Sequence, residues 1–166
     1  YPNTDVGRAE LLADLNRQIV AIKARLPELF AVLPRTPVEV RRVPPAIELG
    51  APRGYAQFGS LDGTRPGAYY INLVDTGIWP KWALPTLTYH ESLPGHHLQG
   101  AIALELGDRM HPIARYLWNS GFGEGWALYS ERLGYDLGLY QDPYSRFGQL
   151  TYDQWRAVRL VVDTGI

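Results

Sequence analysis

Apolar side chains recur at every third or fourth position near the N-terminus, with charged residues between them. The positions of this repeat are Leu12, Leu15, Ile19, Ile22, Leu26 and Leu29. The spacing predicts an amphipathic helix that packs on its own domain, because the stripe is too short for several coiled-coil heptads. Pro27 predicts that the helix breaks or restarts there, since proline removes a backbone donor. Residues 1–37 are therefore expected to form a helix and a linker.

The pattern changes to alternating apolar and polar positions after residue 37. Residues 38–41 alternate and predict a strand, and residues 54–58 and 68–74 predict two more. Turn-forming residues at 62–67 predict a hairpin between the second and third strands. We therefore expect a small antiparallel sheet within residues 38–76.

Helical patterns dominate from Pro85 to the C-terminus. We expect helices over about residues 85–106, 112–118, 124–137 and 144–162. Because a helix, a small sheet and several helices follow one another, the sequence predicts a single α+β domain over residues 1–166. Residues 85–166 are its mostly helical part.

Composition excludes several classes of protein. The net charge of −1, without a basic stripe, argues against nucleic acid as a partner. No apolar run approaches the length that a membrane span requires. Cysteine is absent, which removes disulfides, thiolate metal ligands and a cysteine nucleophile. The N-terminal residues do not form a signal peptide, and both the compartment and the oligomeric state stay open.

Three of the four histidines, His90, His96 and His97, fall within eight residues. A neutral imidazole is the commonest metal ligand, and a glutamate directly after the first histidine, here Glu91, is the arrangement of zinc hydrolases. Glu124 offers a carboxylate further along the chain. Two imidazoles and one carboxylate leave the fourth zinc position open for water, which is typical of a catalytic site. The cluster therefore predicts one zinc ion, with Glu91 as general base.

The spacing of these histidines departs from the usual helical motif, in which the second ligand follows the first by four positions. Six residues of regular helix rise about 9 Å and seven about 10.5 Å, too far for two imidazoles to reach one ion. Pro94 and Gly95 predict a bulge or break that shortens this path. We favour His96 as the second ligand, with His97 as the alternative. The unused histidine would face the substrate or a residue that surrounds the ligands without binding the metal.

A second run, Gly-Glu-Gly-Trp-Ala-Leu-Tyr-Ser-Glu, begins at Gly123. Glu124 is expected at the start of a helix, where its flanking glycines would let the backbone approach the histidine helix. The alternative is a carboxylate favoured only by the helix dipole. Glu131 lies on nearly the same face and would hold a ligating imidazole through its other nitrogen. Tyr129 either polarises a substrate carbonyl or packs on its helix.

Two further residues have alternative roles at a substrate cleft. Asn72 belongs to the third predicted strand, which either pairs with an extended peptide substrate or is an ordinary hairpin strand. Arg156 and Arg159 most simply form charge pairs on a helix surface, with Asp163 four residues after Arg159. If it were buried near the cleft, Arg159 would bind a substrate carboxylate through two hydrogen bonds.

These motifs carry a family resemblance. The run His-Glu-x-x-Pro-Gly-His-His-Leu-Gln, the run Glu-Gly-Trp-Ala-Leu-Tyr-x-Glu-x-Leu and the terminal Arg-Leu-Val-Val-Asp-Thr-Gly-Ile resemble the bacterial family called domain of unknown function 885. Residues 41–166 are similar to the C-terminal part of such proteins, whose full members are several times longer. The second run is also similar to the Glu-Gly-Phe-Ala segment of zinc aminopeptidases, whose glutamate is the third ligand. The resemblance implies a gluzincin-type metallopeptidase.

Three functions fit the sequence. The first is a zinc peptidase that acts on a peptide or small amide. The second is an inactive or metal-free helical module that binds a partner through its Tyr and Trp side chains. The third keeps the metal and hydrolyses an ester or another amide. Since longer relatives are implied, we expect these 166 residues to fold, to be weakly active or inactive alone, and to expose apolar surface.

Overall fold

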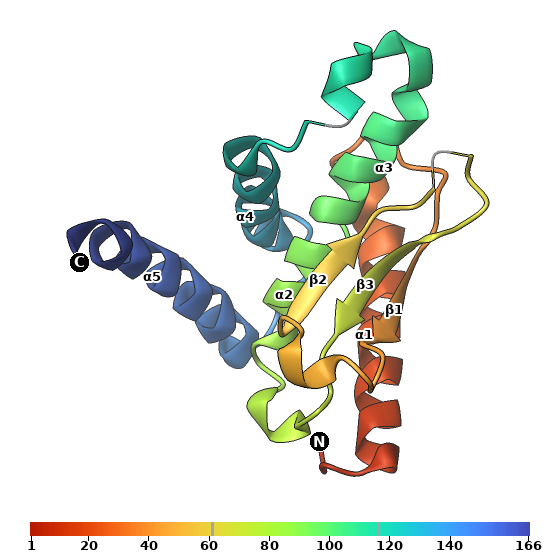
Figure 1. Ribbon diagram of the computed structural model, residues 1–166. Coiled ribbons are helices and arrows are strands. Elements are labelled where there is room, and N and C mark those ends of the chain that lie inside the picture. Colours follow the sequence, from red (N-terminus) through yellow and green to blue (C-terminus); the bar gives the residue numbers. More distant parts are fainter. Residues whose placement is uncertain (61, 116) are drawn as a thin grey trace.

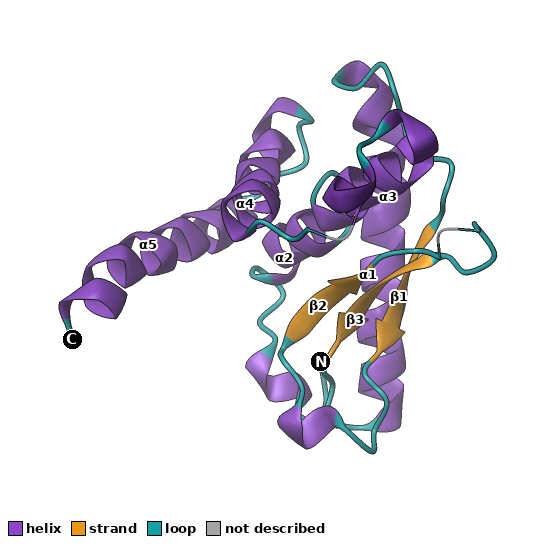
Figure 2. Ribbon diagram, turned by 45° about the horizontal axis from the view of Figure 1, so that its top comes forward, coloured by secondary structure: helices purple, strands orange, loops and turns teal. Residues whose placement is uncertain are grey.

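The computed structural model describes residues 1–60, 62–115 and 117–166. Helices α1 (Asp5–Arg25), α2 (Leu84–Glu91) and α3 (His96–Leu106) lie against one face of a three-stranded sheet (Figures 1 and 2). Helices α4 (Ser120–Asp136) and α5 (Pro143–Gly165) pack beside α2, and the C-terminal half of α5 projects away from the body. The arrangement is the α+β class that the element order predicts.

The N-terminal stripe forms the expected helix. Its side chains Leu15, Ile19, Ile22 and Leu26 are at most 6% exposed and join the main hydrophobic core. The helix ends at Arg25, and a 3₁₀ turn over Leu26–Glu28 contains Pro27, as the proline predicts. The core thus fixes α1 beneath the sheet.

The sheet contains β1 (Val38–Arg42), β2 (Gly54–Gln57) and β3 (Gly67–Ile71) in the order β1-β3-β2. The predicted hairpin between β2 and β3 is confirmed, with Gly54 opposite Ile71. The prediction of a purely antiparallel sheet is wrong, because β1 pairs with β3 in parallel. After β1 the chain crosses to the far edge before it turns back, so β3 enters between the two earlier strands. The alternation of apolar and polar residues predicts where each strand lies, but it does not predict which strand pairs with it.

The C-terminal helices differ from the prediction in one segment. Residues 112–118 form no helix of that length: a 3₁₀ turn covers Pro112–Arg115, Leu117 and Trp118 are non-helical, and position 116 lies outside the described residues. Ile113 and Leu117 are 63% and 68% exposed, so a longer helix would have no apolar face to bury. Helix α4 begins four residues before the expected start, since the Asn119 side chain caps it by accepting from the Phe122 backbone N–H at 3.1 Å.

No helix among residues 1–60, 62–115 and 117–166 is both long enough and apolar enough to cross a membrane.

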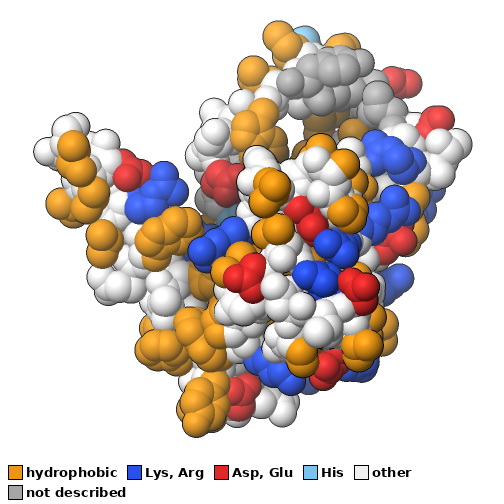
Figure 3. Space-filling model, turned by 60° about the horizontal axis from the view of Figure 1, so that its bottom comes forward, with side chains coloured by type: hydrophobic (Ala, Val, Ile, Leu, Met, Phe, Trp, Pro, Cys, Tyr) orange, Lys and Arg blue, Asp and Glu red, His pale blue; other side chains and the backbone are white. Residues whose placement is uncertain are grey.

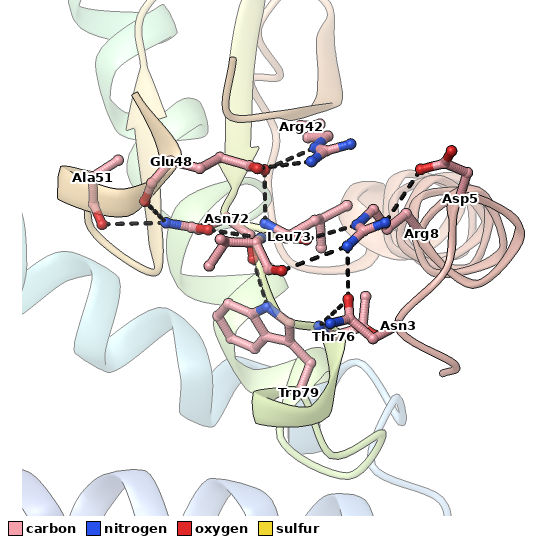
Figure 4. Close-up of polar contacts among 11 residues, drawn as sticks. Asn3, Asp5, Arg8, Arg42, Glu48, Ala51, Asn72, Leu73, Thr76 and Trp79 are labelled. Atoms are coloured by element: carbon pink, nitrogen blue, oxygen red, sulfur yellow. Dashed lines mark hydrogen bonds and ion pairs between the residues drawn. The ribbon is translucent and has the colours of Figure 1, made fainter. Parts of the chain in front are cut away.

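A buried polar network closes the end of the sheet (Figure 4). The Glu48 carboxylate accepts two hydrogen bonds from Arg42, at 2.8 and 2.7 Å, and one from the Leu73 backbone N–H at 3.1 Å. The side-chain amide of Asn72 donates to the backbone carbonyl of Glu48 at 2.6 Å. The backbone carbonyl of Asn72 accepts from the Trp79 indole N–H at 2.7 Å. The network holds the loop after β3, which leads into α2.

We expect Glu48→Gln to lower the free energy of unfolding by about 2 kcal/mol at pH 7, because a charged hydrogen-bond acceptor is lost from a buried position. Arg42 lowers the pKa of Glu48 by hydrogen bonding, against the opposing effect of burial. Because the pKa of Glu48 is lower in the folded state, its ionised carboxylate stabilises the fold at pH values above the unfolded-state pKa of about 4.3. This contribution disappears as the pH falls through the folded-state pKa. Urea unfolding at pH 7 and at lower pH measures both effects.

The matched control is Glu39→Gln, because Glu39 forms an exposed pair with Arg41. We expect this control to change stability by less than about 0.5 kcal/mol. Equal losses in the two variants would show that the Glu48 network contributes no more than a surface pair.

Candidate metal centre

The helix break at Pro94-Gly95 is present, as the sequence predicts. Helix α2 ends at Glu91 and α3 begins at His96. Ser92 leaves the helical region, with φ −109° and ψ −102°, and its hydroxyl donates to the Thr88 carbonyl at 2.6 Å. The connection is therefore a tight turn between two helices rather than one continuous helix.

Gly95 makes this turn possible. A Cβ atom at this position would lie 1.9 Å from the backbone oxygen of His90, so a larger residue would clash with the end of α2. The Pro94 carbonyl accepts hydrogen bonds from the Trp126 indole at 2.9 Å and the Ser130 hydroxyl at 3.2 Å. Both donors belong to α4, so the turn is held against the helix that carries Glu124.

Three side chains converge at this turn. The Nε2 atom of His90 lies 3.3 Å from Oε2 of Glu124, and Nε2 of His96 lies 3.5 Å from Oε1. One ligand atom from each residue lies within 4.8 Å of the other two. Two donors about 2.1 Å from a zinc ion at the tetrahedral angle are about 3.4 Å apart. The spacing and the donor types therefore fit a zinc ion.

His97, the alternative second ligand, is directed elsewhere. Its Nε2–H donates to the Thr36 carbonyl at 3.0 Å, and its ring packs on Gly67 of β3. Consecutive residues of a helix point about 100° apart, so His96 and His97 cannot both face the same centre. The structure brings His96, and not His97, to His90 and Glu124.

Glu131 contacts Nδ1 of His90, the ring nitrogen that does not face Glu124. Its fully buried carboxylate accepts from Nδ1–H of His90 at 2.8 Å and pairs with Arg156 of α5 at 2.6 Å. A guanidinium nitrogen of Arg156 also lies 3.2 Å from Nδ1, but guanidinium only donates, so the shorter carboxylate contact assigns the proton to Nδ1. This tautomer leaves Nε2 of His90 free to bind a metal.

The sequence predicts a surface charge pair for Arg156, whereas the structure places this residue beside the cluster, against Glu131. Its only sequence signal is its position on an amphipathic helix, which does not reveal a partner 25 residues away. Arg159 does pair with Asp163 at 2.8 Å, and both side chains are largely exposed. Tyr129 is 54% exposed and packs on Trp126.

The glycines around Glu124 do not act as predicted. A Cβ at Gly123 would lie 2.2 Å from the Trp118 ring, and a Cβ at Gly125 would meet no atom within 4 Å. The nearest atoms to a Cβ at Gly123 thus belong to Trp118 and not to the histidine helices. The close approach between α4 and α2 occurs at Gly134, where a Cβ would lie 2.8 Å from the Tyr89 ring. Glu124 reaches the histidines from the second turn of α4 instead of its start.

The charges of the cluster are strongly coupled. Burial lowers the pKa of His90, but hydrogen bonds to Glu124 and Glu131 outweigh it and raise that pKa to about 9. Burial and the charge of His90 lower the pKa of His96 to about 4. Burial raises the pKa of Glu91 to about 7, with a further contribution from Glu124 against the opposing effect of His90. A carboxylate with this pKa can gain and release a proton near neutral pH.

Two cavities meet at the cluster, with volumes of about 560 and 390 Å³. Both are lined by His90, Glu91, Glu124 and Gly54. The larger cavity opens between α5 and the body, where Figure 3 shows basic, acidic and histidine side chains beside apolar ones. A substrate that spans both cavities would pass directly over the cluster.

The strand proposed to pair with substrate is not at an edge. β3 lies in the centre of the sheet, with β1 and β2 on its two sides, so its backbone cannot bind an additional strand. The open edge beside the cavities is β2, whose Gly54 lines both. Asn72, expected near the substrate, uses its amide in the loop network described above.

Comparisons with known proteins agree with the resemblance to the bacterial family. The family model described as "Bacterial protein of unknown function (DUF885)" matches residues 1–166. A crystal structure described as that of "the putative lipoprotein from Colwellia psychrerythraea" is similar over 99% of this chain, with 44% sequence identity and a TM-score of 0.92. The chain spans 28% of the length of that protein. No curated protein matches it. The chain therefore belongs to the bacterial family of unknown function DUF885.

Proposed function

We propose that the protein is a zinc-dependent hydrolase, a metallopeptidase of the gluzincin type. The observation that carries the proposal is the convergence of two imidazole Nε2 atoms, from His90 and His96, on the Glu124 carboxylate at 3.3 and 3.5 Å. A zinc ion held by these three groups would supply an activated water and polarise the carbonyl of an amide bond. The substrate would be a peptide or a small amide.

Glu91 is the proposed general base. Its side chain is 7% exposed, borders both cavities and directly follows the first ligand in sequence. Burial raises its pKa to about 7, which suits a group that first takes a proton from water and then delivers it to the leaving amine. A fully ionised carboxylate with an ordinary pKa would hold that proton more weakly.

The buried pair of Glu131 and Arg156 positions the first ligand. Glu131 fixes the tautomer and orientation of His90, and Arg156 neutralises the buried charge of Glu131. Because Arg156 comes from α5, the pair also joins α2, α4 and α5 around the site. Such outer partners typically alter metal affinity or activity by about 10- to 100-fold when they are removed.

The direct test is metal content. Protein purified without a chelator is expected to contain about one zinc per chain, and removal of the metal should lower the melting temperature, since zinc bound only by the folded state stabilises it. The control substitution His111→Ala should leave this zinc content unchanged, because His111 is exposed and lies outside the cluster. Less than about a tenth of an equivalent after addition of zinc would contradict the proposal and favour a metal-free binding module.

A further inference from the structure

The larger cavity beside the cluster combines an apolar wall with basic side chains. Its apolar wall includes aromatic rings from two parts of the chain, namely Trp79, Trp82, Tyr152 and Trp155. The charged groups on its surface are Arg53, Arg156, Arg159, Glu91 and Glu124. A volume of about 560 Å³ is within the range of small-molecule sites. This cavity therefore suits a ligand with both an apolar group and an anionic group.

The three guanidinium groups of this cavity differ in their ion-pair partners. Arg156 is bound to the buried carboxylate of Glu131, and Arg159 pairs with the exposed Asp163. Within residues 1–60, 62–115 and 117–166, no carboxylate forms an ion pair with Arg53. The backbone carbonyl of Arg53 accepts from the Asn72 N–H at 2.8 Å, which anchors the residue at the start of β2. Arg53 is exposed and borders the cavity, so its guanidinium can bind an anion there.

The smaller cavity on the other side of the cluster has a different character. Apart from the residues that the two cavities share and His96, it is lined by Pro52, Tyr55, Ala56, Phe58 and Trp118, without lysine or arginine. Among the described residues that line the two cavities, lysine and arginine therefore border the larger cavity and not the smaller one. A substrate lying across the site would place its anionic end in the larger cavity.

We propose that the larger cavity binds the free α-carboxylate of an amide substrate whose last residue is apolar or aromatic, with Arg53 as the main anchor and Arg159 beside it. The carboxylate would accept two hydrogen bonds from the planar guanidinium, and the side chain would pack on the aromatic wall. The amide bond before that residue then lies at the cluster. The substrates are peptides with a free C-terminus or N-acyl amino acids, and the assignment of cleavage rests on the proposed zinc function.

Binding of a matched pair of compounds tests the carboxylate site without requiring turnover. The probes are N-acetyl-L-phenylalanine and N-acetyl-L-phenylalaninamide, which differ only in the carboxylate, measured by titration calorimetry on the 166-residue chain. The acid is expected to bind at least about tenfold more tightly than the amide. Arg53→Gln should remove this preference, and Arg17→Gln, on the outer surface of α1, should retain it. Equal affinities, no binding of either probe, or an unchanged preference in Arg53→Gln would overturn the proposal.

Cleavage assays separate this proposal from the zinc function. Zinc-loaded protein should hydrolyse a peptide ending in free phenylalanine at least about tenfold faster, in kcat/KM, than the same peptide ending in an amide. Equal hydrolysis of the two would overturn the carboxylate site and leave the hydrolase intact. Acid-selective binding without zinc uptake would sustain the carboxylate site and overturn the hydrolase. Peptide and N-acetyl substrates, compared with each other, identify which of the two sources the enzyme uses.

Discussion

Glu91→Gln is expected to keep one zinc per chain and to lower kcat by about a hundredfold to ten-thousandfold. The amide has nearly the same shape as the carboxylate but cannot take a proton from water, and general base catalysis contributes an effect of this size. Because Glu91 is not among the three converging ligands, the metal should stay bound. Zinc analysis and steady-state kinetics on the same preparation measure both properties.

The matched control for this substitution is Glu10→Gln, which changes an exposed glutamate of α1. It should leave both zinc content and kcat unchanged. Full activity in Glu91→Gln would show that another group accepts the proton, and loss of zinc would show that Glu91 belongs to the ligand set.

His96→Ala and His97→Ala are expected to have opposite effects, although the two residues are adjacent. His96→Ala removes a ligand, so zinc affinity should fall by more than about a hundredfold, beyond the effect of losing an outer partner. His97→Ala should retain zinc, because its Nε2–H bonds to the Thr36 carbonyl instead. Its cost should be about 1–3 kcal/mol in the free energy of unfolding, from a lost buried hydrogen bond and a small cavity.

Competition with a fluorescent zinc chelator gives the two affinities, and urea unfolding of the metal-free proteins gives the two stabilities. Each variant is the control for the other, since both remove a buried imidazole from the first turn of α3. Zinc loss in His97→Ala with retention in His96→Ala would reverse the ligand assignment.

The parts of the site that depend on local chain geometry could be predicted from the sequence. A proline and a glycine between His90 and His96 indicate a broken helix, because one lacks a donor and the other tolerates close backbone contact. The spacing between Glu124 and Glu131 likewise places both carboxylates on one helical face. The structure has both features, with the break after Glu91 and both carboxylates directed toward His90.

The features that could not be predicted depend on contacts between distant segments. Arg156 reaches Glu131 because α4 and α5 both pack beside α2, which no spacing along the chain encodes. The parallel pairing of β1 with β3 depends on the path between them and not on the alternation within either strand. Arg53 likewise directly precedes β2, and it borders the cavity because β2 lies at the edge of the sheet.

The close contact between Gly95 and the carbonyl of His90 has a consequence for recognising such proteins from genomes. A search that requires a second histidine four positions after the first would miss this chain, because its second cluster histidine comes six positions later. The turn that makes this longer spacing work tolerates no Cβ at position 95. A pattern of His-Glu, two variable residues, Pro-Gly and His describes the geometry better than the histidine spacing alone. Histidine and glutamate clusters of this shape are therefore underestimated wherever only the regular helical motif is counted.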